Sequence, residues 1–182
     1  MSTAESAQSP ADAQFWAFCV SVYGRPVVAE ECLSLQERFG VNVLLLLLCG
    51  YVGAEWGALL PAESIAEADR AVRDWHVKVV TRLRELRRRL KDPGMHSQSL
   101  PTPSAELLRG EIKAAELASE RIEAAMLAQW CDARRANWAR VDRQMAVTRN
   151  LQALLANYGA GSSTAWPQHL ASEALKDAPV TS

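Results

Sequence analysis

The stretch FWAFCVSVYGRPVVAEECLSLQERFGVNVLLLLLCGYV, residues 15–52, decides the fold of this 182-residue chain. Gly24-Arg25-Pro26 interrupts the stretch, and Gly40 interrupts it again before the leucines begin. On both sides of the first break, apolar residues recur every three or four positions, which is typical of helices with one buried face. Because proline suits the first turn of a helix and glycine the position after its end, we predict helices over residues 10–23 and 26–39.

The leucine block that follows is almost free of charge. Sixteen uncharged residues separate Arg38 from Glu55, and five of them are consecutive leucines. A helix that is apolar on nearly every face must be surrounded by other helices, so we predict a central buried helix over residues 42–60. A membrane-spanning helix needs about 20 apolar residues, and this block is shorter, so we predict no membrane span.

The rest of the chain has two long helical patterns. Apolar residues form one stripe from Ile65 to Leu90, and a second pattern runs from Ser104 to Trp130. We predict an all-α protein, a single bundle of five or six helices, in which these two helices form a long antiparallel pair against the leucine-rich helix. Residues 132–158 either continue the second of them or bend near Asn137.

Length and composition set the expected domain boundaries. A chain of 182 residues is long enough for one domain with its own core and too short for two comfortable ones. We predict a disordered N-terminus over residues 1–8 and a single helical domain over residues 9–158, with an internal linker at 92–103. Residues 159–182 are small and polar in their first part, which predicts a mobile C-terminal tail.

Cysteine usage and the first residues indicate a compartment. Four cysteines lie in apolar helical patterns without any C-x-x-C pair, and they are Cys19, Cys32, Cys49 and Cys131. Free, buried thiols are typical of proteins in reducing compartments. The N-terminus has neither a basic start nor an apolar core, so it does not read as a secretory signal. We therefore expect a cytoplasmic protein.

Several residues of the opening stretch form a motif together. They are Phe15-Trp16, Tyr23, Pro26, Cys32-Leu33-x-Leu35-Gln36, Gly40 and the leucines after Val43. On these residues the chain resembles an uncharacterised bacterial family of short all-helical proteins, a domain of unknown function. The chain has Val27 where members usually have Gly, and Asn42-Val43-Leu44 where they tend to have Asp-Val-Asn. The resemblance implies a helical fold and a cytoplasmic bacterial setting, and it implies no reaction.

A cluster of cations before residue 92 is the strongest functional signal. Residues 73–92 hold eight basic and three acidic side chains, whereas residues 1–72 hold three basic and nine acidic ones. Guanidinium groups form bidentate contacts with phosphate and carboxylate, so the cluster is a candidate site for a partner or an anion. Its members are Arg82, Arg84, Arg87, Arg88, Arg89 and Lys91. The alternative is a solvated face, partly neutralised by acidic helices that carry Glu30, Glu31 and Glu37 or Glu106, Glu111, Glu116, Glu120 and Glu123.

A second candidate site is a polar-edged pocket lined by aromatic and amide side chains. Its members are Trp16, Tyr23, Gln36, Asn42 and Trp56. The alternative is a satisfied core network, because buried Tyr and Trp need partners for their polar tips, and Asn42 also suits the cap of the leucine-rich helix. His76 has no Cys, Asp or Glu at metal-ligand spacing, so we expect no metal site and no cofactor.

The sequence names no reaction. The chain has no G-x-S-x-G elbow and no phosphate-binding loop, so we lean against an enzyme. The leading hypothesis is a non-enzymatic protein-interaction module, which uses the charged faces of the two long helices to bind a protein partner or itself. The alternatives are nucleic-acid association through the Arg-rich helix of residues 78–91 and a small-molecule or enzymatic site near Trp16, Tyr23 and Asn42.

Overall fold

The computed structural model describes residues 10–91, 102–160 and 166–177. These residues form helices joined by short connections, with no strand among them and one isolated bridge between Ala58 and Arg140. The elements are α1 (Pro10–Tyr23), α2 (Pro26–Phe39), α3 (Val43–Trp56), α4 (Ala62–Trp75), the π-helix η1 (His76–Val80), α5 (Thr81–Arg89), α6 (Thr102–Asp132), the 3-10 turn η3 (Arg135–Asn137), α7 (Arg143–Asn157) and α8 (Gln168–Asp177).

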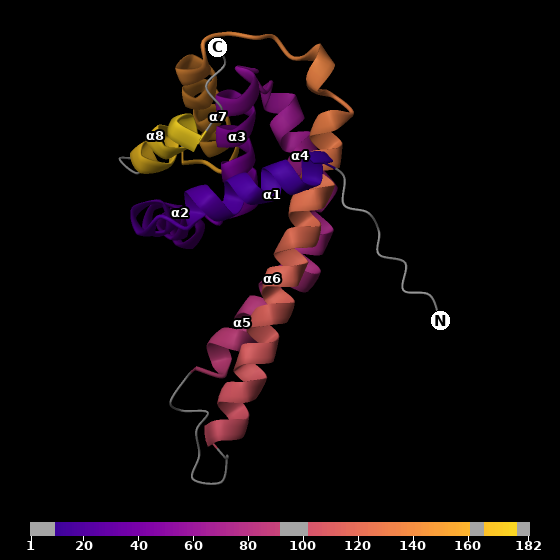
Figure 1. Ribbon diagram of the computed structural model, residues 1–182, viewed down its shortest axis with the longest axis vertical. Helices are drawn as coiled ribbons and strands as arrows, with labels where there is room; N and C mark the ends of the chain where they lie inside the picture. The colour runs from indigo at the N-terminus through magenta and orange to yellow at the C-terminus, as the bar shows by residue number, and fades with distance from the viewer. Residues whose placement is uncertain (1–9, 92–101, 161–165, 178–182) are drawn as a thin grey trace.

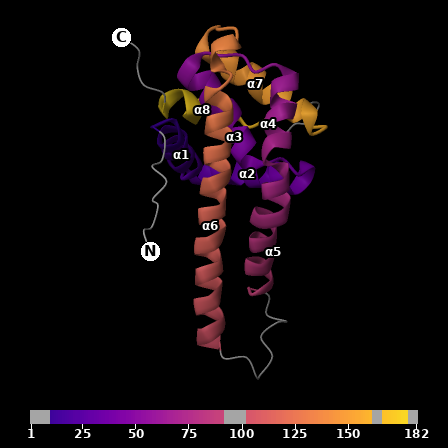
Figure 2. The same ribbon diagram turned by 90° about the vertical axis from the view of Figure 1, so that its right-hand side faces the viewer.

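The helices are arranged as a body and an arm. Figures 1 and 2 show α5 and α6 side by side and antiparallel, projecting away from the helices that surround α3. We call η1, α5 and the part of α6 beside them the arm. The predicted all-α class, with a central leucine-rich helix and a long antiparallel pair, is confirmed, but the described residues form more helices than the five or six predicted, because the π-helix divides one of them and α8 was not expected.

The first two helices begin and end where the sequence predicts. Pro26 lies in the first turn of α2, where its missing N–H costs no hydrogen bond. Gly40 ends the helix in the left-handed region at φ 69°, and its N–H donates to the carbonyl oxygen of Gln36 at 2.9 Å.

Helix α3 is the centre of the body. The Asn42 side chain caps the helix by accepting a hydrogen bond from the Leu44 N–H at 3.0 Å, and every residue from Leu44 to Ala54 is buried. Gly53 lets α3 approach α7 closely, because a Cβ built there would lie 2.5 Å from the Val147 nitrogen. None of the helices in the described parts of the chain is both long enough and apolar enough to cross a membrane.

The predicted helix over residues 65–90 is present, but it contains a π-helical turn. It begins at Ala62, three residues earlier than expected, and the π-helix His76–Val80 divides it into α4 and α5. Such wide turns are rare and occur often at functional sites. Periodicity alone does not reveal this one, because the apolar stripe passes through it without a break.

The prediction of a mobile tail over residues 159–182 is wrong for the segment 166–177. Helix α8 lies on the body, with Leu170 and Ala174 fully buried. The Glu31 carboxylate accepts hydrogen bonds from the backbone N–H groups of His169 and Leu170, both at 2.9 Å, and so caps the helix from outside. Arg25 adds an ion pair to Glu173 at 3.1 Å.

The other predicted boundaries fall partly inside and partly outside the described residues. Residues 133–142 break the chain between α6 and α7, which selects the bend near Asn137 over a continuous helix. The predicted disordered N-terminus, residues 1–8, and most of the predicted linker, residues 92–101, lie outside the described residues. All four cysteines are buried in the body.

Candidate functional site

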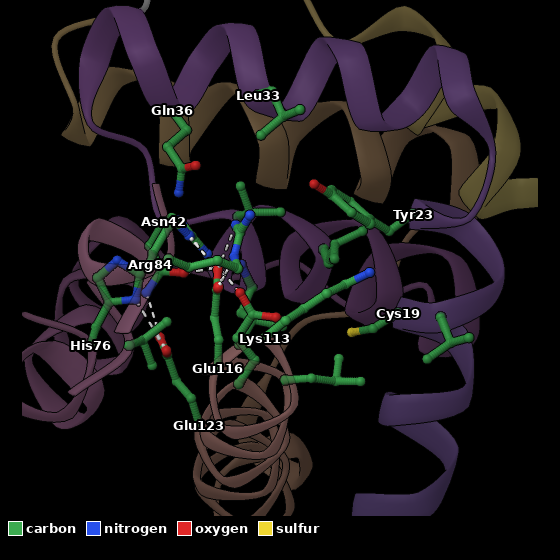
Figure 3. Close-up of a pocket in the computed structure, with 18 of the residues that line it drawn as sticks. Cys19, Tyr23, Leu33, Gln36, Asn42, His76, Arg84, Lys113, Glu116 and Glu123 are labelled. Atoms are coloured by element: carbon green, nitrogen blue, oxygen red, sulfur yellow. Dashed lines mark hydrogen bonds and ion pairs between the residues drawn. The ribbon is translucent and has the colours of Figure 1, made fainter. Parts of the chain in front are cut away.

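A cavity of about 390 Å³ lies between the arm and the N-terminal helices. Helices α1 and α2 form one wall, η1, α5 and α6 form the other, and the start of α3 lies between them. Figure 3 shows side chains from all these elements pointing into one space. Pockets for small ligands have volumes of about 300–1,000 Å³, so this cavity is of a size that can hold one.

The polar end of the cavity is built around a buried carboxylate. The Glu123 side chain has no exposed surface, accepts a hydrogen bond from the Asn42 side-chain amide at 2.6 Å, and lies 3.1 Å from Nδ1 of His76. Asn42 therefore has two tasks, because its oxygen caps α3 and its amide holds Glu123. This arrangement ties α3, η1 and α6 together at one point (Figure 3).

The π-helix places two side chains in the wall of the cavity. His76 begins the π-helix and Val80 ends it, and both line the cavity. Just before it, the indole N–H of Trp75 donates to the backbone carbonyl of Ser119 at 2.9 Å, which fixes the wide turn against α6.

Next to this end lies a network of arginines and glutamates between α5 and α6. Arg84 donates to Glu116 at 3.1 Å and to Glu120 at 2.6 Å, and Arg87 donates to both oxygens of Glu116. Their side chains are largely buried, with Glu116 only 8% exposed and Arg84 17% exposed. The network holds the two helices of the arm together on the side that faces the cavity.

Burial and pairing act in opposite directions on the two carboxylates. Burial disfavours the charged form of Glu116, but the hydrogen bonds from Arg87 and Arg84 outweigh it and lower the pKa of this carboxyl. At Glu120 burial is the stronger effect and raises the pKa, although Arg84 opposes it. Glu116 is thus the firmly ionised member of the network.

Two further cations line the cavity without such a partner. Arg88 on α5 and Lys113 on α6 are both exposed lining residues, and neither makes a hydrogen bond or an ion pair with another residue of the described ranges. Figure 3 shows Lys113 reaching along the cavity toward Tyr23. These two side chains are available to an anion.

The opposite wall is aromatic and apolar. Trp16 and Tyr23 come from α1, and Figure 3 shows the Tyr23 hydroxyl and the Gln36 amide directed into the space. Exposed apolar side chains of α1 and α2 lie beside them, with Val20 56% exposed and Leu33 37% exposed. Burial raises the pKa of Tyr23, so its hydroxyl is a neutral hydrogen-bonding group at neutral pH.

Cys19 lines the cavity too, but it does not have the properties of a reactive thiol. Burial raises the pKa of Cys19 well above its usual value, with smaller contributions from Cys32 and Glu120. Because the thiolate is the nucleophilic form, this thiol is unreactive at neutral pH. Within the described residues, no three side chains of His, Cys, Asp or Glu are grouped so that they could hold a metal ion.

The structure brings parts of the two predicted sites together into one. Of the pocket candidates, Trp16, Tyr23, Gln36 and Asn42 line the cavity, and of the cationic candidates, Arg84, Arg87 and Arg88 do so. The other cationic candidates are exposed outside the cavity, and they are Arg82, Arg89 and Lys91. Arg82 pairs with Glu85 at 2.9 Å.

Trp56 lies in a separate aromatic cluster. Its ring is 5.4 Å from that of Tyr51 and 6.4 Å from that of Trp138, measured between centroids. The Arg135 guanidinium lies 5.4 Å from the Trp56 centroid. This cluster joins the end of α3 to the segment after α6 and has no side chain in the cavity.

Sequence reasoning did not identify His76 and Lys113 as site residues, and it treated the glutamates of α6 only as neutralising charges. One signal could have pointed to the glutamates. Glu116, Glu120 and Glu123 follow each other at spacings of four and three residues, which places their side chains on one face of a helix. Carboxylates on one face of a helix indicate polar partners on its neighbours: α5 supplies arginines to Glu116 and Glu120, whereas Glu123 is held by Asn42 and His76.

Comparison with known proteins gives one match. The family model described as "Protein of unknown function (DUF2390)" matches residues 14–127, a segment that contains every lining residue of the cavity. No curated protein and no solved structure matches the chain. Since the match covers 114 of 182 residues, the chain belongs to this family of unknown function.

Proposed function

We propose that this protein binds a small molecule in the cavity between the arm and the N-terminal helices. The observation that carries this proposal is the lining of the cavity. Apolar side chains, two polar groups directed inward and two cations without partners among the described residues surround one space of about 390 Å³. A mostly apolar pocket with a few convergent polar groups is the usual form of a ligand site.

Binding is better supported than catalysis. The lining carboxylates are held by arginines, by Asn42 or by His76, which leaves them in fixed positions. The one lining thiol, Cys19, is kept protonated by burial. A nucleophile next to a base, which covalent catalysis requires, is not formed by the described lining residues.

A cavity-filling variant with a matched control tests this proposal. Leu117 and Ile122 are both on α6 and similarly exposed, at 54% and 48%, but only Leu117 lines the cavity. We expect Leu117→Trp to fill the opening and Ile122→Trp to leave it unchanged, with both variants folded. The measurement is protein-observed NMR with a set of small acids, bases and neutral compounds.

The proposal predicts that members of this set shift the signals of lining residues in the wild type and in Ile122→Trp, and not in Leu117→Trp. If no compound of any charge shifts the lining signals, or if Leu117→Trp responds as the wild type does, the cavity is not a ligand site.

A second candidate is the interaction module, because the arm carries exposed apolar side chains. Leu107 is 73% exposed, Leu108 48% and Leu86 46%, and all three lie on α5 or α6. Light scattering of Leu107→Ser with Leu108→Ser tests self-association through this surface. If the variant has the same mass as the wild type at every concentration, self-association through this surface is ruled out.

The other predictions from the sequence stay predictions. Nucleic-acid association would depend on Arg82, Arg88, Arg89 and Lys91, because Arg84 and Arg87 pair with glutamates. Its test is binding that weakens steeply as salt increases. We propose a cytoplasmic bacterial setting on the grounds of four buried cysteines and the resemblance of the motif.

A further inference from the structure

We infer that the ligand is a small amphipathic anion, with its acidic group held by Arg88 and Lys113. This inference rests on the proposed ligand site and adds the chemical class of the ligand. The apolar part of the molecule lies against the exposed side chains of the cavity wall, which are Val20, Leu33 and Leu117.

The charges in the lining favour an anion. Four cationic side chains and three carboxylates line the cavity, so the lining carries one more positive than negative charge if His76 is neutral. The three carboxylates are engaged, Glu116 and Glu120 with arginines and Glu123 with Asn42 and His76. The excess positive charge therefore belongs to Arg88 and Lys113, the two cations without partners among the described residues.

A cationic ligand fits this lining poorly. Glu123 has no exposed surface and Glu116 is 8% exposed, so neither can be reached without breaking the contacts that hold the arm. Glu120 is more accessible, at 26% exposed, but one of its oxygens already accepts from Arg84. A ligand ammonium group would also have to approach Lys113 and Arg88, which repel it.

Neutral polar groups in the cavity complement an acid group. The Tyr23 hydroxyl and the Gln36 amide point into the space, Tyr23 on the side of Lys113 and Gln36 on the side of Asn42 (Figure 3), and both can donate hydrogen bonds. Carboxylate and phosphate oxygens accept several hydrogen bonds, and those from charged donors are the strongest. A molecule without an acceptor oxygen gains no hydrogen bonds from the donors of Arg88, Lys113, Tyr23 and Gln36.

The volume limits the size of the ligand. A water-sized group occupies about 30 Å³ in a liquid, so a cavity of about 390 Å³ holds on the order of a dozen non-hydrogen atoms. An acid with an unbranched chain of eight carbons is of this size. Longer chains would have to leave through the opening beside Leu117, which lines it and is exposed.

Matched probes of one chain length test the inference by calorimetry and by protein-observed NMR. The probes are octanoate, octyl phosphate, octanol and octylamine, together with inorganic phosphate. We expect octanoate or octyl phosphate to shift the lining signals, and octanol, octylamine and inorganic phosphate to bind at least about ten-fold more weakly, since a hydrogen bond to a charged group is worth a factor of this order. Comparing the two acids distinguishes a carboxylate ligand from a phosphate ligand.

Adjacent arginines of α5 supply the control variants. Arg88 lines the cavity and Arg89 does not, and both are exposed, so Arg88→Glu and Arg89→Glu make the same charge change at neighbouring positions. We expect Arg88→Glu and Lys113→Glu to weaken binding of the acid by about ten-fold or more. Arg89→Glu should bind as the wild type does.

The results separate this inference from the proposed function. The anion assignment would be overturned if octanol or octylamine shifted the NMR signals of the lining residues as much as the acids do. It would also be overturned if Arg88→Glu and Arg89→Glu weakened binding of the acid equally. Either result would leave the ligand site itself in place. No cavity shift by any probe or by any member of the wider compound set would overturn both.

Discussion

Replacing Glu123 with Ala should cost the protein about 3 kcal/mol of folding free energy. The carboxylate is fully buried and accepts from Asn42 at 2.6 Å, so its removal leaves the Asn42 amide buried without a partner, which costs about 1–3 kcal/mol. His76 loses its neighbour at 3.1 Å, and the vacated volume adds a cavity term. Together these losses amount to about 3 kcal/mol.

The assay is urea denaturation, with thermal melting as a second measure. A loss of about 3 kcal/mol lowers Tm by roughly 6–12 °C in a chain of this size. Glu123→Gln keeps an acceptor for Asn42 and should lose less than Glu123→Ala. Glu111→Ala, an exposed position of the same helix, should change stability by less than about 0.5 kcal/mol. A typical mutation changes the free energy of unfolding by about 1 kcal/mol. If the free energy of unfolding of Glu123→Ala lies within about 1 kcal/mol of the wild-type value, at an unchanged m value, the buried contacts do not stabilise the fold as described.

Four other substitutions test separate parts of the structure. The pKa of Glu116 is lowered in the folded state, so its contribution to the free energy of unfolding is present above the unfolded pKa near 4.5 and is lost as pH falls through the folded pKa. In an acid titration, Glu116→Gln should therefore lose less of its folding free energy over that pH range than the wild type does. Gly53→Ala should destabilise by about 1–3 kcal/mol because its Cβ would meet the α7 backbone, whereas Gly110→Ala, with nothing within 4 Å, should stabilise the helix by about 0.5–1 kcal/mol, as measured by denaturation. Glu31→Ala should remove the external cap of α8 at a cost of about 1 kcal/mol and speed hydrogen exchange in that helix, and unchanged exchange would contradict the capping role.

Local signals were sufficient for the first three helices. Pro26 has a fixed φ that suits the first turn of a helix, and Gly40 readily adopts the left-handed conformation that ends one, so they mark the boundaries of α2 without reference to other parts of the chain. Asn42 likewise caps α3 through its own neighbour, Leu44. The burial of α3 follows from its composition, since a helix without a polar face must be covered.

Helix α8 could not be predicted in this way, because its stability comes from distant residues. A ten-residue helix is marginal in isolation, and the contacts that hold α8 come from Glu31 and Arg25, more than 130 positions earlier in the chain. Small and polar composition was therefore a poor guide for residues 166–177.

The candidate site was predicted in halves. The aromatic and amide residues and the arginines were each recognised from local patterns, but their meeting at one cavity depends on how α5 and α6 pack beside α1 and α2. Trp56 shows the limit of the same reasoning. It resembles the other aromatic candidates by type, yet its partner Trp138 lies 82 residues further along and draws it into another cluster.

The π-helix His76–Val80 sets the rotational orientation of α5 relative to α4. A π-turn amounts to one inserted residue in an α-helix, and each residue of an α-helix turns the chain by about 100°. Removing one residue there would turn the face of α5 away from α6 by that angle. Arg84 and Arg87 would no longer meet Glu116, and Arg88 would leave the cavity wall. Deleting a single residue of the π-helix, with no other change in the chain, would thus disrupt the site on the arm without altering any residue of the body.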